Sequence, residues 1–143
     1  LLSVRHFEEF MVPRYRKVTN VLKEYGVTIN ILDCDGDITL LVPGWLKGGI
    51  NCMFPLEARF TDVYKIKENF GRRVLLMGGV DKMALIKGGK AVDKELERLA
   101  PMLKEGGFIP LVDHRCPPEI SYSSYGYYLK KKREWIGREA PEV

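Results

Sequence analysis

The sequence has few cysteines and few histidines, and this scarcity excludes several kinds of site. The three cysteines, Cys34, Cys52 and Cys116, include no CxxC pair, so we expect no disulfide framework and predict a reducing, cytoplasmic setting. The two histidines, His6 and His114, are too few for a metal site built on several imidazoles. Motifs of phosphate-binding loops, zinc proteases and serine hydrolases are also absent.

Long hydrophobic runs and a strong charge of one sign are missing as well. No apolar run approaches the roughly 20 residues that a membrane span needs, so we expect no membrane insertion. The net charge of +4 suits an anionic small-molecule substrate, whereas the scattered basic residues do not predict nucleic-acid binding. The length of 143 residues fits one globular domain. Because the chain begins Leu-Leu-Ser, without Met or a signal peptide, we expect it to be part of a longer one.

What the sequence does contain is a regular alternation of short apolar segments with helical ones. Strands are expected near residues 28–33, 50–54, 73–78 and 108–112. Helices are expected over residues 7–25, 38–46, 62–69 and 90–104, and after Pro117-Pro118. Such βα repeats form parallel sheets with right-handed crossovers. None of the strands has the charged character of an edge strand. The sequence therefore predicts an α/β chain that forms half of a TIM (β/α)8 barrel, with four parallel strands and outer helices.

Polar residues follow each expected strand. Asp33 and Asp35 follow the first, Glu57 the second, Asp81 the third and His114 the fourth. In βα barrels the loops after the strands carry the active site, so these side chains are expected to face one concavity. His114 is the candidate catalytic residue, because an imidazole changes protonation near neutral pH. The four carboxylates are candidate substrate-binding residues.

Structural roles compete with function at some of these aspartates. Asp37 is predicted to cap the next helix, and Asp35 to hold the turn before Gly36. Asp81 is placed to cap a helix as well. For Asp33 and Asp35 three functions remain open: general acid or base, ligand of a hard metal ion, or acceptor for a cationic or N–H-bearing ligand.

A metal ion is an alternative to a site without cofactors. Its ligand set would be Asp33, Asp35, His114 and Cys116. Carboxylates and imidazole suit a hard or borderline metal better than a soft one. The main expectation is that no metal or other cofactor is bound.

Four motifs in order along the chain resemble the C-terminal half of the uroporphyrinogen decarboxylase family. They are Leu32-Asp33-Cys34-Asp35-Gly36-Asp37, Gly78-Gly79-Val80-Asp81, Gly107-Phe108-Ile109-Pro110 and Asp113-His114-Arg115-Cys116-Pro117-Pro118. Their order and spacing carry the resemblance, which runs from about Phe7 to Ile136. It implies a cofactor-free (βα)8 barrel that removes the acetate carboxyls of uroporphyrinogen in porphyrin biosynthesis. It also implies that His114 matches the site histidine of the family's Gly-His-Gly segment.

The resemblance also leaves other activities open. The family includes corrinoid-dependent methyltransferases, in which a His-x-Cys-Gly segment stands where this chain has Asp33-Cys34-Asp35-Gly36. That alternative implies a metal ion and a corrinoid protein as partner. The chain also departs from the decarboxylases, with Phe54-Pro55-Leu56 in place of an Asp-Trp pair and Lys82 in place of proline. A third reading is a non-catalytic half-barrel that self-associates or binds a missing N-terminal half.

Overall fold

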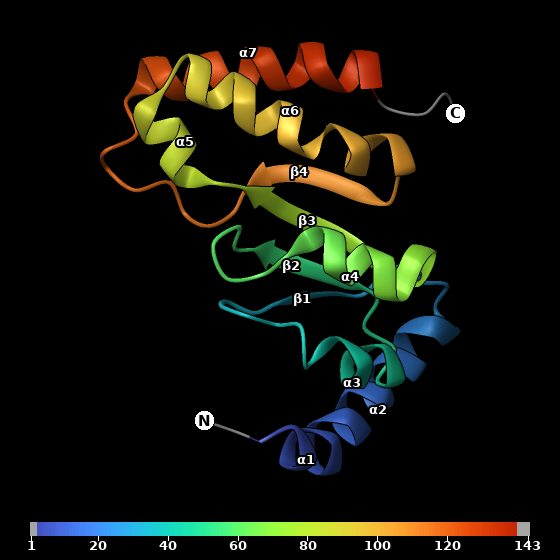
Figure 1. Ribbon diagram of the computed structural model, residues 1–143. Helices are drawn as coiled ribbons and strands as arrows, with labels where there is room; N and C mark the ends of the chain where they lie inside the picture. The colour runs from blue at the N-terminus through green and yellow to red at the C-terminus, as the bar shows by residue number, and fades with distance from the viewer. Residues whose placement is uncertain (1–2, 140–143) are drawn as a thin grey trace.

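Four parallel strands follow one another across a single sheet in the order of the chain (Figure 1). The computed structural model describes residues 3–139. The strands are β1 (Ile31–Asp33), β2 (Cys52–Leu56), β3 (Leu75–Val80) and β4 (Phe108–Val112). Each connection carries helix, as parallel pairing requires. The expected α/β architecture, four parallel strands of half a TIM barrel, is confirmed.

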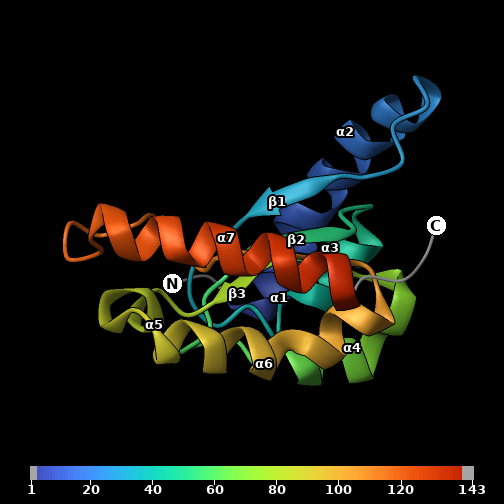
Figure 2. The ribbon, with the colours of Figure 1, turned by 90° about the horizontal axis from the view of Figure 1, so that it is seen from above.

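Helices precede, separate and follow the strands, and those between β2 and β4 lie together on one side of the sheet (Figure 2). Their bounds are α1 Val4–His6, the π-helix η1 Phe7–Met11, α2 Val12–Glu24, α3 Val42–Lys47, α4 Val63–Phe70, the 3-10 helix η2 Gly71–Arg73, α5 Lys82–Lys87, α6 Lys90–Glu105 and α7 Tyr122–Glu139. Helices α4, α5 and α6 lie along the sheet, and α7 packs against α5 and α6. None of the helices within residues 3–139 combines the length and apolar character needed to cross a bilayer.

The core lies between the sheet and these helices. Successive strand residues point to opposite faces of a sheet. Met53 of β2 and Leu76 of β3 both point toward the helices, and both are inaccessible to solvent. Leu85 of α5 and Leu99 of α6 are equally buried on the helical side. The side chains between the sheet and the helices of the half-barrel therefore form a solvent-inaccessible hydrophobic core.

The other face of the sheet is apolar but open. We define the concave face by five side chains that line a cavity of about 410 Å³: Ile31, Cys52, Leu75, Met77 and Ile109. Ile31 and Ile109 are each 53% exposed. In a closed barrel this layer is packed by residues from all eight strands. Here the sheet ends at β1 and β4, which each pair on one side only within the described chain.

Two elements are shorter than the sequence predicts. Strand β1 begins at Ile31 instead of residue 28, because its neighbour in the sheet, β2, begins at Cys52, which pairs with Ile31. Helix α3 begins at Val42 instead of residue 38, with Pro43 in its first turn. Ahead of it, the Ile38 N–H donates to Thr61 Oγ1 at 3.3 Å. This long-range bond holds residue 38 in a turn outside the helix.

The predicted helix cap at Asp37 is wrong. The Asp37 carboxylate accepts the Thr39 N–H at 3.0 Å, which closes a local turn. The residue that precedes α3 is Leu41, and it makes no side-chain cap. The hydrogen bonds with Thr39 lower the pKa of Asp37.

Candidate functional site

His114 and Asp35 meet at the carboxyl ends of the strands. Asp35 belongs to the loop after β1 and His114 to the loop after β4, and His114 Nε2 lies 3.5 Å from Asp35 Oδ1. The pair borders a cavity of about 310 Å³ that is also lined by Asp33, Phe54, Pro55 and Arg115. Three of the five sequence-predicted site residues, Asp33, Asp35 and His114, are thus brought to one cavity.

This cavity presents both acidic and basic groups to a ligand. Its imidazole is 35% exposed, so it can reach a bound molecule and also exchange protons with solvent. The Asp33 carboxylate can accept hydrogen bonds from N–H groups, and the Arg115 guanidinium can pair with a ligand carboxylate. The arrangement suits a ligand that carries N–H groups together with acidic side chains.

Glu57 has a different position from the one predicted for it. It is buried, and it is not among the residues that line the 310 Å³ cavity. Its Oε2 accepts the Gly36 N–H at 2.7 Å, and its Oε1 lies 3.5 Å from Lys82 Nζ. Glu57 therefore ties the loop after β1 to the loop after β3. It also takes the turn-holding role predicted for Asp35, whose carboxylate faces His114 instead.

Asp81 caps helix α5, which confirms the structural reading of this residue. Its Oδ1 accepts the Met83 N–H at 2.8 Å, and its Oδ2 lies 3.9 Å from Arg59 Nε. It does not line the cavity beside His114. Its negative charge at a helix N-terminus is electrostatically favourable.

The site residue that the sequence analysis missed is Asp113. Its side chain is fully buried. Oδ2 accepts the Ala58 N–H at 3.0 Å, Oδ1 accepts the Lys82 N–H at 3.1 Å, and Lys82 Nζ lies 3.6 Å away. Burial raises the pKa of Asp113, while the two N–H groups and the Lys82 ammonium oppose that rise. The sequence did contain a signal for this position. Neighbouring residues of a strand point to opposite faces, so if His114 faces the cavity, Asp113 is expected to point away from it.

Glu57, Lys82 and Asp113 together form what we call the strand-tip network. It links Gly36 after β1, Glu57 and Ala58 after β2, Lys82 after β3 and Asp113 after β4. Because it joins the loops after all four strands, it fixes the position of the loops that carry Asp35 and His114. A positively charged partner is needed for two buried carboxylates, and Lys82 provides it.

The alternative metal ligands are not assembled as a set. Within residues 3–139, no three His, Cys, Asp or Glu side chains are grouped so that they could hold a metal ion. Burial also raises the pKa of the Cys116 thiol, and a thiol must lose its proton to bind a metal. The donors present do not fit a metal, and no chemical step is assigned to one.

Comparison with known families gives one match. The family model described as Uroporphyrinogen decarboxylase (URO-D) matches residues 1–135, which include all four strands and every site residue described above. A comparison with curated proteins gave no match.

Proposed function

Because this chain belongs to the uroporphyrinogen decarboxylase family, we propose that it supplies half of a decarboxylase barrel acting on the acetate side chains of a tetrapyrrole. Family membership supports a decarboxylase-like or related TIM-barrel function. The observation that carries the finer proposal is the His114–Asp35 pair, 3.5 Å apart on the rim of the cavity. The mildly basic chain also suits an anionic substrate.

The proposed reaction needs one proton donor and several positioning groups. The bond between the acetate methylene and its carboxyl carbon breaks, CO₂ leaves, and the electron pair stays on the methylene carbon and the ring. A proton from the His114 imidazolium replaces the lost carboxyl on that carbon. Asp35 orients the imidazole, Asp33 accepts ring N–H groups, and Arg115 binds a remaining carboxylate. Solvent then returns a proton to His114.

We also propose that the reaction uses no resident cofactor and takes place in the reducing cytoplasm. Cys34, Cys52 and Cys116 are all free thiols. Burial raises the pKa of each of them, and at Cys34 the charges of Asp35 and Asp33 add to the rise. The thiols therefore stay protonated near neutral pH, and they suit neither metal binding nor nucleophilic attack.

The proposed function is tested by removing the imidazole in the intact protein. His114→Ala is expected to lower kcat for CO₂ release from uroporphyrinogen by about 100-fold or more, because general acid catalysis contributes that much. His6→Ala is the matched control, since His6 is exposed in the first helix, and it is expected to leave kcat unchanged. Equal turnover by both variants contradicts the role of His114. Methyl transfer to a corrinoid protein without CO₂ release contradicts decarboxylation.

The concave face supports a proposal about the partner. Its exposed Ile31 and Ile109 need an apolar surface to cover them, so we propose that the chain pairs with a second half-barrel, either an N-terminal half or another copy of itself. By sedimentation velocity we expect the purified chain to self-associate. Ile109→Lys is expected to raise the dissociation constant by about 10-fold or more, since a lysine at an apolar interface core is strongly unfavourable.

Val18→Lys is the control for this experiment. Val18 lies on α2 and is 59% exposed, so it undergoes the same apolar-to-charged change away from the concave face. We expect the dissociation constant for self-association of the Val18→Lys variant to equal that of the unaltered chain. A chain that stays monomeric up to about 100 µM, or an equal effect of both substitutions, rules out association through the concave face.

A further inference from the structure

A second cavity lies at the opposite end of the sheet from His114. It has a volume of about 400 Å³, and it is lined by the charged residues Lys67, Arg72, Lys104 and Glu105 and by Leu75, Gly106 and Gly107. Leu75 begins β3 and Gly107 precedes β4, so this is the amino end of the strands. Active sites of βα barrels lie at the other end, and the reaction proposed above does not use this cavity.

Lys67 is a buried cation at this cavity. It is 3% exposed, and its ammonium donates to Gly106 O at 2.9 Å. That bond uses one of three N–H donors and satisfies a carbonyl at the end of α6. Among the described residues 3–139, no carboxylate oxygen lies within 4.0 Å of Lys67 Nζ. A buried charge without a counter-charge is costly, so an anion at this place is favourable.

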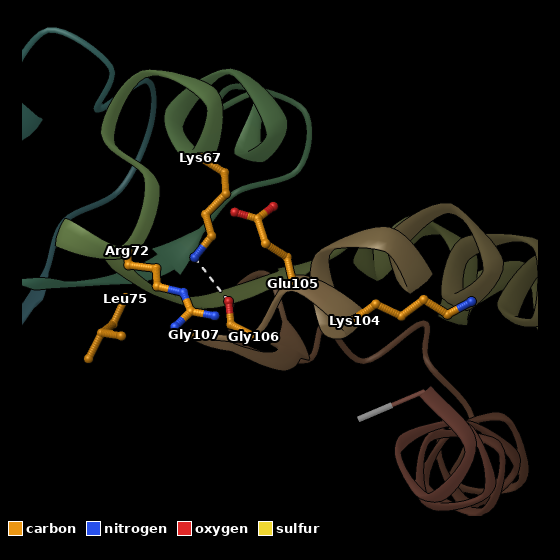
Figure 3. Close-up of a pocket in the computed structure, with 7 residues that line it drawn as sticks. All are labelled: Lys67, Arg72, Leu75, Lys104, Glu105, Gly106 and Gly107. Carbon is orange, nitrogen blue, oxygen red and sulfur yellow. Dashed lines mark hydrogen bonds between the residues drawn. The ribbon is translucent and has the colours of Figure 1, made fainter. Parts of the chain in front are cut away.

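Arg72 supplies a second cation, and no structural role accounts for it. Figure 3 shows the guanidinium of Arg72 and the ammonium of Lys67 directed toward the same space beside Gly106 and Gly107, while Lys104 extends away from it. Within residues 3–139 the Arg72 side chain makes no hydrogen bond and no ion pair. An unpaired guanidinium has a fork of N–H donors that matches two oxygens of a phosphate group.

Glycine at position 107 keeps the space in front of Lys67 open. Its φ is +69°, and a Cβ there would lie 3.0 Å from Lys67 Nζ. A side chain would therefore crowd the ammonium as well as strain the backbone. Glu105 is the one unfavourable group, since its carboxylate also lines the cavity. It reduces the positive potential and so disfavours ligands with several negative charges close together.

We infer that Lys67 and Arg72 form a binding site for a phosphate group, either free phosphate or the terminal phosphate of a small metabolite. The cavity volume is in the range of small-molecule sites. The site lies at the end of the barrel away from the His114 cavity, so it is a second ligand site and its occupancy does not depend on the proposed decarboxylation. Bound phosphate bridges η2 to the turn between α6 and β4, and stabilises the fold by mass action.

The test is isothermal titration calorimetry of the full chain at constant ionic strength, with inorganic phosphate and with glycerol 3-phosphate. Arg72→Gln is expected to weaken phosphate binding by about 10-fold or more, because a charge-assisted pair is lost. Glu105→Gln is expected to tighten it by about 2- to 5-fold through loss of repulsion. Both side chains are exposed, so neither change threatens folding. Tighter binding of glycerol 3-phosphate identifies a phosphomonoester ligand, and equal binding identifies free phosphate; both results support the site.

Lys65→Gln is the matched control for general charge effects. Lys65 lies exposed on α4, the helix that carries Lys67, and does not line the cavity. The affinity of the Lys65→Gln variant for phosphate is expected to stay within about 2-fold of that of the unaltered chain. Absence of binding up to about 10 mM phosphate overturns the inference. A loss in Lys65→Gln equal to that in Arg72→Gln overturns it as well, because binding would then follow net charge alone.

Discussion

Replacing Asp113 by alanine is expected to lower the free energy of unfolding by about 3–5 kcal/mol. The substitution removes the acceptor of the Ala58 and Lys82 N–H groups and a charge partner of the Lys82 ammonium. All of these groups stay buried or half-buried, so they pay the full cost of lost hydrogen bonds. Urea unfolding at a fixed protein concentration measures the change. Glu97→Ala, an exposed acidic residue on α6, is expected to change the stability by less than about 0.5 kcal/mol.

The pH dependence of this effect follows from the raised pKa of Asp113. A carboxyl whose folded pKa is above its unfolded pKa binds its proton more tightly in the folded state. Its contribution to stability is therefore greatest in acid and falls as the pH rises from its ordinary value of 3.8 through the higher folded pKa. Asp113→Asn does not titrate at this position. We expect its deficit relative to the unaltered chain to shrink as the pH rises through this range, and a deficit that grows contradicts the assignment.

Gly78→Ala is expected to destabilise the fold by about 2–5 kcal/mol, the sum of an unfavourable backbone conformation and overpacking. Gly78 has a φ of +115°, and a Cβ would lie 2.5 Å from the backbone nitrogen of Leu56. The register of β2 against β3 shifts between Met53 and Leu56, where Gly78 pairs with Leu56. The three atoms nearest to that Cβ are all backbone atoms of Pro55 and Leu56, so a methyl group has no flexible neighbour to displace. Urea or thermal unfolding of the variant measures the loss.

Gly126→Ala is the control for this substitution. Gly126 lies inside α7, its φ is not positive, and nothing lies within 4 Å of the place of its Cβ. Alanine favours a helix interior over glycine, so we expect a gain of about 0.5–1 kcal/mol. A loss below about 1 kcal/mol for Gly78→Ala shows that β2 and β3 can separate to admit a methyl group.

The strand order could be predicted from the sequence because it rests on local signals. Strand β4, Phe108–Val112, has the bounds expected from its apolar run and the glycines before it. The ends of β1 and α3 were not predictable in the same way. The extent of β1 depends on where β2 offers a partner at Cys52, and the start of α3 depends on the bond from Ile38 to Thr61. Both are contacts between residues more than 20 positions apart.

The candidate site, too, could be predicted in part from local signals, while the rest depends on contacts between distant residues. Asp33, Asp35 and His114 could be predicted to converge because parallel strands end at one edge of a sheet. That argument places a residue at the edge but does not give the direction of its side chain. The directions decide that Glu57 contacts Gly36 and Lys82 and that Asp113 bonds Ala58, whereas the cap at Asp81 is a local contact and could be predicted. The contacts of Glu57 and Asp113 join residues 21 to 55 positions apart in sequence, and such pairs leave no periodic signal.

The open concave face makes the proposed pairing of half-barrels depend on the concentration of the chain. The core on the helical side of the sheet is built within this one half, with Leu76, Leu85 and Leu99 inaccessible to solvent. In the pairing proposed above, Ile31, Met77 and Ile109 on the concave face form the contact surface, and the fraction of paired chains follows mass action. Dilution then favours the single half, and accumulation favours the paired form.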